Sequence, residues 1–258
     1  MAIKRLRLVE LIKDKVETLP PEQSFLSDLK MTVSALNPTR ERSTHYKPSS
    51  LHCARMVYFD KIQAPVDTTL IEYSGVRIAE TGSSSHERIQ YYVSEMKKAG
   101  KPCEFIDVEQ YIKEHNLTYL QIKNKKTYET HLYDTRYDLS FLCDGIIKYN
   151  DKYYILEIKT ETDTKGVYRE SADDYHLNQS VAYSLTLGID DIMWLYEERN
   201  FCIPKTFHTI VTSEQRAKLL LFFEIVEQAV KDMVPPPKCN SRRSCEYCSY
   251  KTQCRKYR

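Results

Sequence analysis

The sequence predicts an α/β fold with a mixed central sheet. Three observations support this: an ordinary globular composition, the order of the periodic segments, and a switch from helical to strand-like spacing. The 258 residues suit one large domain with short appendages, and 41% of them are hydrophobic and 29% charged. Helical patterns come first and strand-like runs follow. A final helix, strand, strand and helix complete the order expected of an α/β domain.

Residues 1–47 are expected to form a helical extension. The first 17 residues are amphipathic but do not resemble a signal peptide, because Glu10, Asp14 and Glu17 interrupt any apolar core. No apolar run in the chain approaches the roughly 20 residues that span a bilayer. We therefore expect a cytoplasmic protein with no membrane partner.

Two helices are expected next, over residues 47–62 and 81–100. The second has serines near its start that can cap it, and Gly100 at its end. The pattern over residues 101–137 is mixed. We expect a short strand, a short helix and a basic loop there, the loop being the sequence KNKK at 123–126.

The segment DGIIKYNDKYYILEIKT, residues 144–160, is expected to form a β-hairpin with a two-residue turn at Asn150-Asp151. Three prolines follow the last predicted helix and separate it from a cysteine-rich basic tail, residues 238–258. Between the hairpin and the prolines we expect a helix, two strands and a long helix, at residues 172–188, 191–200, 202–212 and 213–233.

The hairpin carries three charged residues among apolar neighbours. A two-residue turn pairs Tyr149 with Lys152, and the same register places Asp144 opposite Glu157. Because side chains alternate along a strand, Lys159 shares a face with Glu157. Two carboxylates this close repel unless a cation neutralises them, and their hard oxygen atoms suit Mg²⁺ or Mn²⁺. The alternative is an exposed strand of alternating charge, but the apolar neighbours favour a metal site.

Asp144, followed by Glu157, Ile158 and Lys159, resembles the signature of the PD-(D/E)XK nuclease superfamily. The resemblance implies a restriction-endonuclease-like mixed central sheet flanked by helices. It also implies that Asp144, Glu157 and the backbone carbonyl of Ile158 bind a divalent metal ion. Lys159 would then orient or deprotonate the attacking water.

Two further features are similar to the RecB-like branch of that superfamily. One is a histidine on an upstream helix, which His86 supplies and which would complete the metal site. The other is a Gln-x-x-x-Tyr pair after the lysine strand, which Gln179 and Tyr183 supply on one helical face. This pair would position the substrate strand or active-site side chains. The alternative for His86 is a helix-capping or surface histidine. The alternative for Gln179 and Tyr183 is that they lie on an ordinary helix surface.

Cysteine usage indicates a second metal site. Eight cysteines in a reducing compartment favour metal binding over disulfides. Cys245, Cys248 and Cys254 have Cys-x2-Cys-x5-Cys spacing, which is typical of metal ligands. Cys239 could complete a local zinc site, or a distant cysteine could complete an iron–sulfur cluster. The remaining cysteines lie in apolar strand patterns and are expected in the core: Cys103, Cys143 and Cys202.

The segment SSLHCARMVYFD around Cys53 resembles the N-terminal cysteine segment of the iron–sulfur CRISPR-associated exonucleases (the fourth Cas protein) and of related phage and AddB-type nucleases. Ala54 stands where that motif often has proline. In those proteins one cysteine before the nuclease core and three after it hold a 4Fe-4S cluster. The resemblance covers residues 48–258. The cluster ligands that it implies are Cys53, Cys245, Cys248 and Cys254.

The domain organisation that follows is a helical extension, a RecB-like nuclease core, and a tail that packs with Cys53 around the cluster. The corresponding ranges are residues 1–47, 48–237 and 238–258.

The function implied by the resemblance is that of a Mg²⁺- or Mn²⁺-dependent deoxyribonuclease. It would be an exonuclease acting on single-stranded DNA or DNA ends in recombination, replication or repair. Recombination or replication proteins are then candidate partners, and a phage-encoded protein would act in the host cytoplasm. The alternatives are a nuclease-fold protein that binds DNA ends without cleaving them, and a zinc-ribbon nucleic-acid-binding protein.

The basic tail also suits single-stranded nucleic acid, because lysines and arginines contact phosphates and interleaved tyrosines stack on bases. The alternative is a solvated tail. The tyrosines concerned are Tyr247, Tyr250 and Tyr257.

Overall fold

The computed structural model describes residues 20–37, 42–67, 73–162, 168–239, 245–246 and 248–257. The amphipathic segment of the first 17 residues lies outside this part of the chain. The described residues form two compact units, one of residues 20–37 and 73–79 and the other of the remainder. The first unit contains α2 (Pro21–Leu36), which begins with proline at its first position, where no backbone N–H is needed.

The second unit is built on a mixed five-stranded sheet with the order β1-β5-β6-β7-β8. Strands β6 and β7 are parallel and the other neighbours are antiparallel. Helix α7 (Asp174–Leu187) makes the crossover between the two parallel strands. The predicted α/β class and mixed sheet are confirmed. The strands are β1 Cys103–Ile106, β5 Gly145–Tyr149, β6 Lys152–Glu161, β7 Asp191–Glu198 and β8 Pro204–Ile210.

A second, antiparallel sheet has three strands, β2 (Leu120–Lys125), β3 (Thr130–Asp134) and β4 (Leu139–Cys143). The sequence predicted a basic loop at residues 123–126, and this was wrong because β2 continues to Lys125. β2 is an edge strand whose second half is exposed. Its lysines point into solvent, as is common on an edge strand, and this makes the strand look like a loop in the sequence.

The remaining helices differ from prediction mainly at their boundaries. The helix expected from residue 47 begins only at Ala54, because Pro48–Ser50 forms a short 3₁₀ turn. The helix expected from residue 81 begins earlier, at Tyr73. No helix in the described ranges is long and apolar enough to cross a membrane. The helices are α3 Ala54–Lys61, α4 Tyr73–Glu95, α5 Val108–Glu114, α8 Ser213–Asp232 and α10 Lys251–Arg255.

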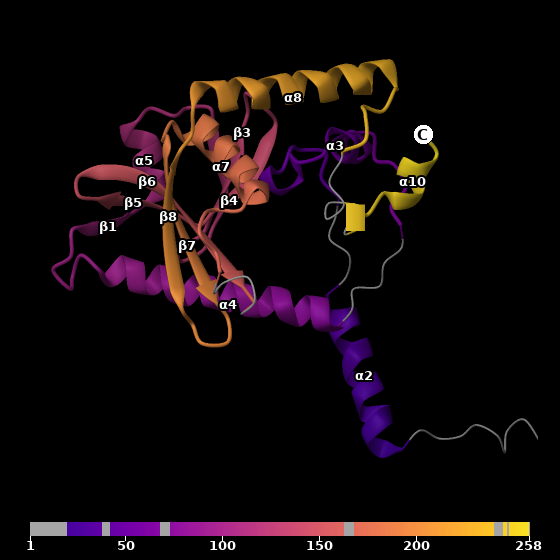
Figure 1. The fold of residues 1–258 in the computed structure, drawn as a ribbon, viewed down its shortest axis with the longest axis horizontal. Coiled ribbons are helices and arrows are strands. Elements are labelled where there is room, and N and C mark those ends of the chain that lie inside the picture. The colour runs from indigo at the N-terminus through magenta and orange to yellow at the C-terminus, as the bar shows by residue number, and fades with distance from the viewer. Residues whose placement is uncertain are drawn as a thin grey trace, which may run out of the picture. The chain divides into compact units, whose positions relative to one another are not determined.

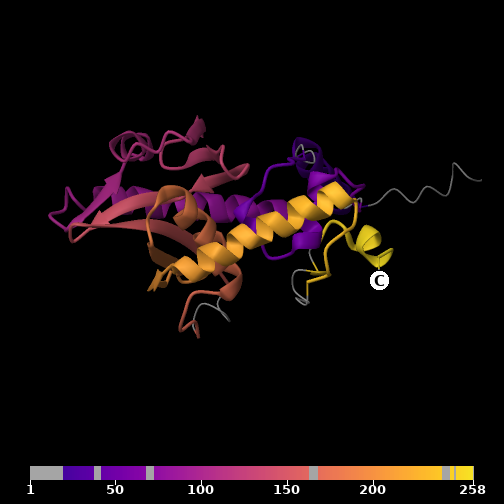
Figure 2. The ribbon, with the colours of Figure 1, turned by 90° about the horizontal axis from the view of Figure 1, so that it is seen from above.

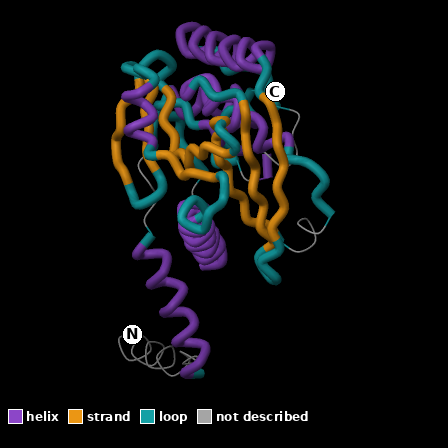
Figure 3. The backbone as a smooth tube through the Cα atoms, turned by 90° about the vertical axis from the view of Figure 1, so that its left-hand side faces the viewer, coloured by secondary structure: helices purple, strands orange, loops and turns teal. Residues whose placement is uncertain are grey.

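Helices cover both faces of the five-stranded sheet (Figures 1 and 3). Ile89 and Val93 of α4 pack with sheet residues that include Leu156 and Ile158. On the opposite face, residues of α7 and α8 pack with Ile155 and other sheet residues. Because adjacent residues of β6 point to opposite faces, its near-continuous apolar run serves two cores.

A third apolar cluster joins α3 to the end of α8 and to the C-terminal segment, which lie together in Figure 2. Tyr58 and Phe59 of α3 pack there with Ala229 and Tyr250. The Tyr250 hydroxyl donates a hydrogen bond to Asp60 Oδ1 at 2.6 Å. The start of the second unit is thus attached to its end, and this positions the cysteines.

Candidate functional site

The hairpin of β5 and β6 has the predicted turn and register. Asn150 and Asp151 have φ values of 47° and 63°, as a two-residue hairpin turn requires, and Asn and Asp tolerate this conformation. Tyr149 pairs with Lys152 and Gly145 pairs with Leu156. The residues of the turn therefore fix which residues face each other at the far end of the hairpin.

Asp144 lies where the chain leaves β4 of the small sheet and enters β5 of the large one. Its Oδ2 accepts a hydrogen bond from the Ile158 N–H at 2.8 Å, and its carbonyl accepts one from Gln90 Nε2 at 2.6 Å. Only 8% of Asp144 is exposed. Strand β6 and helix α4 thus hold this carboxylate from two sides.

Glu157 and Lys159 are adjacent on one face of β6, as the alternation predicted. Lys159 Nζ lies 2.5 Å from Glu157 Oε1, and Glu157 is 2% exposed. Burial alone would lower the pKa of Lys159, but the charges of Glu157 and Asp144 outweigh it and raise that pKa. Lys159 is therefore held as an ammonium group among carboxylates.

His86 comes to this site from α4. Its Nδ1 lies 3.6 Å from Asp144 Oδ1, and its side chain is 20% exposed. Burial would lower the pKa of His86, but the contact with Asp144 and the charge of that carboxylate raise it overall. Burial alone would raise the pKa of Asp144. His86 and Lys159 outweigh it and hold the pKa of this carboxyl below its usual value.

Glu129 is a site residue that sequence reasoning missed. It lies between β2 and β3, and one ligand atom from each of His86, Glu129 and Asp144 lies within 4.8 Å of the others. No motif includes Glu129, because the packing of the small sheet brings it there. The only signal was a carboxylate beside the basic stretch at 123–126.

Gln179 and Tyr183 are buried on α7 rather than on its solvent surface. Burial raises the pKa of Tyr183 well above its usual value, and the charges of Glu157 and Asp144 raise it further. Ionisation of the Tyr183 hydroxyl is therefore strongly disfavoured in this environment. The buried Oε1 of Gln179 has no hydrogen-bond partner within the described chain.

The donor set of this site consists of carboxylates and one imidazole, and it includes no thiolate. Such oxygen-rich sets suit Mg²⁺ and Mn²⁺, and an imidazole suits Mn²⁺ better than Mg²⁺. A cation would also relieve the repulsion between Asp144 and Glu157, both of which are buried. His86, Glu129 and Asp144 therefore fit a divalent cation, whereas Glu157, a predicted ligand, is not part of that group and pairs with Lys159. The backbone carbonyl of Ile158 stays a predicted ligand.

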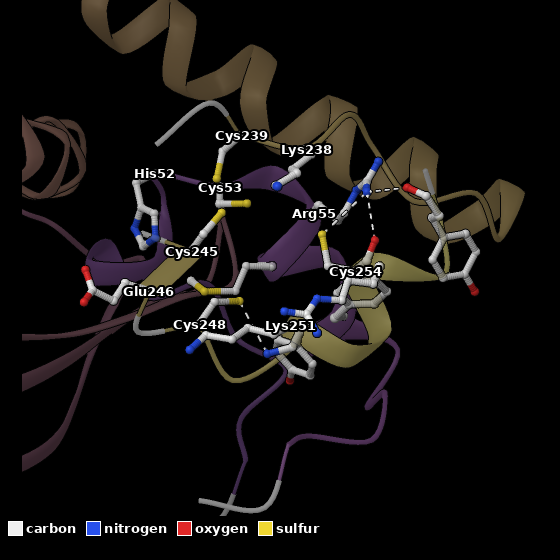
Figure 4. A pocket seen from close by; sticks show the side chains of 15 residues that line it. His52, Cys53, Arg55, Lys238, Cys239, Cys245, Glu246, Cys248, Lys251 and Cys254 are labelled. Atoms are coloured by element: carbon white, nitrogen blue, oxygen red, sulfur yellow. Dashed lines mark hydrogen bonds between the residues drawn. The ribbon is translucent and has the colours of Figure 1, made fainter. Parts of the chain in front are cut away.

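The second group of predicted ligands lines one cavity of about 780 Å³. Figure 4 shows the cysteine side chains around it. Burial, and then the neighbouring Cys239 thiol, raise the pKa of Cys245, and burial raises that of Cys248. The cavity therefore brings together the four ligands expected for a cluster and the cysteine of the zinc alternative. These residues are Cys53, Cys239, Cys245, Cys248 and Cys254.

Arg55 fastens the C-terminal segment to α3 beside this cavity. Its Nε donates to the Pro236 carbonyl at 2.7 Å, and its Nη1 donates to the Tyr257 carbonyl at 2.8 Å. Nη1 also lies 3.6 Å from Cys254 Sγ. A donor to a sulfur atom stabilises negative charge on it, which suits a metal-bound thiolate.

The expectations for the remaining cysteines and for the tail tyrosines have mixed outcomes. Cys103 and Cys143 are buried, as predicted. Cys202 was predicted in the core but is exposed, because it lies in the turn between β7 and β8 with a φ of 55°. Of the three tail tyrosines that suit base stacking, Tyr250 is buried against α3, Tyr257 is exposed, and Tyr247 lies outside the described residues.

Comparison with known proteins adds little to this geometry. No family model matches the sequence, and no curated protein matches it. Among solved structures, the chain is similar to one described as "Crystal structure of SSO0001", with 13% sequence identity and a TM-score of 0.48. The alignment covers 93% of this chain and 100% of that chain.

Proposed function

We propose that this protein is a divalent-metal-dependent deoxyribonuclease of the PD-(D/E)XK superfamily, RecB-like branch, with the restriction-endonuclease-like fold. It would hydrolyse DNA from ends or on single strands. The observation that carries the proposal is that the His86–Asp144 and Lys159–Glu157 pairs are largely buried and close enough for their charges to act on one another. Buried carboxylates beside a lysine and a histidine are costly to fold and are typical of functional sites.

Asp144, Glu157, His86 and the carbonyl of Ile158 would hold Mg²⁺ or Mn²⁺. When bound, the ion lowers the pKa of a coordinated water and offsets negative charge on the scissile phosphate. Strand β6 orients this set, because its Ile158 N–H fixes the rotamer of Asp144 at 2.8 Å. The strand that carries Glu157 therefore also holds the Asp144 carboxylate in place.

Lys159 would act on the water and on the phosphate. As an ammonium group it donates hydrogen bonds that orient the water, and its charge offsets the charge that develops on the phosphate. It can pass a proton onward only after Glu157 no longer neutralises it, since their present contact favours the ammonium form. Gln179 would use its unpaired Oε1 to position an active-site group or the DNA strand.

The cysteine cavity would hold a 4Fe-4S cluster with a structural role, bound by Cys53, Cys245, Cys248 and Cys254. Lysines and arginines near it are exposed and could contact DNA phosphates. Those in the described chain are Lys238, Lys251, Arg255 and Lys256.

The test is cleavage of end-labelled single- and double-stranded DNA with and without Mn²⁺. Asp144→Asn, Glu157→Gln and Lys159→Ala should each reduce cleavage by at least about 100-fold, while DNA binding is retained. Each change removes a metal ligand or the ammonium group without introducing bulk. A chelator should stop cleavage by the wild-type protein.

The chain supplies a matched control in its other Glu-x-Lys sequence, Glu95 and Lys97 on the α4 side of the molecule. These two residues pair with Lys98 and Glu104 at the surface instead of with each other. Glu95→Gln and Lys97→Ala should therefore cleave DNA normally. Full activity of Glu157→Gln, or equal losses in the control variants, would contradict the proposal.

A further inference from the structure

We propose that Glu129, carried by the connection between β2 and β3, is a further ligand of the divalent cation bound by His86 and Asp144. This inference rests on the proposed function, because it adds a residue to the same metal site. Glu129 belongs to none of the motifs that identify the site in the sequence. The structure joins it to the site through tertiary packing alone.

The separations of the ligand atoms carry the proposal. Ligands at about 2.1 Å from an octahedral ion lie about 3.0 Å apart when adjacent and about 4.2 Å apart when opposite. His86 Nδ1 and Asp144 Oδ1 are 3.6 Å apart, which is too long for a hydrogen bond and within this range. Glu129 places an oxygen in the same group of atoms, all within 4.8 Å. One cation can therefore contact all three side chains after small rotamer adjustments.

The backbone holds Glu129 in place. The Lys126 N–H donates to the Glu129 carbonyl at 2.9 Å, which closes the connection between the two strands. This connection lies against α4, where residues 126–129 and α4 residues such as Glu87 and Gln90 line a cavity of about 160 Å³. Gln90 in turn binds the Asp144 carbonyl. Glu129 and Asp144 thus lie beside the same stretch of helix.

The present partner of Glu129 is an exposed lysine. Lys126 Nζ lies 3.2 Å from Glu129 Oε2, and 66% of the Lys126 side chain is exposed. A surface pair of this kind contributes little, about 0 to 1 kcal/mol, so a divalent cation can replace the lysine. Glu129 would then turn to the ion. Lys126, released beside the metal, would be available to contact a DNA phosphate.

Mn²⁺ binding to the full-length protein tests the proposal directly. Titration can be followed by electron paramagnetic resonance, since the sharp spectrum of free aqueous Mn²⁺ disappears on binding. Glu129→Gln should weaken Mn²⁺ binding by at least about tenfold, and Glu129→Asp should weaken it less because the carboxylate remains. Glu87→Gln is the matched control: Glu87 is an exposed carboxylate that lines the same small cavity but is not one of the three grouped ligands.

Wild-type affinity in Glu129→Gln, or the same loss in Glu87→Gln, would overturn the assignment. Thermal unfolding of the metal-free variants separates lost affinity from lost folding. DNA cleavage by the wild-type protein, with its loss in Glu157→Gln, reports on the proposed function independently. If cleavage needs Mn²⁺ while Glu129→Gln binds Mn²⁺ normally, the nuclease proposal stands and this inference fails.

The release of Lys126 has its own test. Lys126→Met should bind Mn²⁺ several-fold more tightly than the wild type, because no ammonium group competes for Glu129. Lys125→Met is the control, because it removes the same charge from the neighbouring position while Lys125 pairs with Asp107 and not with Glu129. Equal effects of the two substitutions would show that Lys126 does not compete with the cation.

Discussion

The environment of Glu157 differs strongly from that of an ordinary, solvated carboxylate. It lies in the middle of a sheet, is 2% exposed, and has Lys159 at 2.5 Å and Asp144 nearby. Burial raises the pKa of Glu157 to about 7, while the charge of Lys159 opposes this shift and that of Asp144 adds to it. An ionised Glu157 is therefore costly in the folded protein even beside Lys159, unless a metal cation also accompanies it.

This cost predicts a pH dependence of stability. The folded protein binds the Glu157 proton more tightly than the unfolded chain, in which the pKa of this carboxyl is near 4.5. By linkage, metal-free protein loses stability as pH rises from about 4.5 to about 7. Glu157→Gln has no such proton and should lose less stability over this range.

Denaturant unfolding in the presence of a chelator, at about pH 5 and about pH 7.5, would measure the difference. Added Mn²⁺ should restore the stability of the wild-type protein at the higher pH, since ligand binding stabilises the folded state. Identical pH profiles for the wild type and Glu157→Gln would refute this account of Glu157.

At the scale of elements, the Phe105 side chain of β1 lies close to the backbone of β5 beside Asp144. Gly145 follows Asp144 directly, and a Cβ atom at position 145 would lie 2.6 Å from Cζ of Phe105. The aromatic ring occupies the space that any side chain would need. A side chain at this position would therefore force the Phe105 ring to shift.

Gly145→Ala should destabilise the protein by about 1–3 kcal/mol, because the added methyl would overlap the Phe105 ring and force it to move. Cleavage should fall as well, since a shift of β5 moves Asp144. Phe105→Leu in the same chain should recover part of the stability. Chemical denaturation and DNA cleavage measure the two effects.

Gly75→Ala serves as the comparison, because nothing lies within 4 Å of a Cβ atom at that helical position. Alanine there should stabilise α4 by about 0.5–1 kcal/mol. If both alanine variants have the same stability, the close approach of Phe105 does not constrain the hairpin.

At the scale of the whole molecule, the second unit is closed by contacts between α3 and the C-terminal segment. Arg55, Asp60 and the apolar cluster around Phe59 make these contacts. They place Cys53 in the same cavity as cysteines from the other end of the chain. A metal cluster at that position would join two distant parts of the sequence and stabilise the fold through loop closure.

Two variants from this cavity distinguish a 4Fe-4S cluster from a local zinc site. Cys53→Ser should lose iron, lose visible absorbance and destabilise the domain, whereas Cys239→Ser should keep all three properties. Anaerobically purified wild-type protein should contain about four irons per chain. Iron analysis, visible spectroscopy and thermal unfolding provide the measurements. The reverse pattern, or stoichiometric zinc without iron, would assign the site to the tail alone.

The elements that could be predicted from sequence depend on local chemistry. The Asn150-Asp151 turn selects one register, and alternation then places Glu157 and Lys159 on one face. The crossover helix and the long C-terminal helix were also predicted, since each has a strong pattern and clear ends. These features arise from neighbours within a few residues of one another.

Only the tertiary structure decided which distant groups meet. Glu129 reaches His86 because a sheet whose strands were not predicted packs near α4. The burial of Gln179, and the shared cavity of Cys53 and Cys239, likewise depend on packing between distant segments. A local pattern predicts the face on which a residue lies. It does not predict which element will cover that face, because the packing of the whole chain determines this.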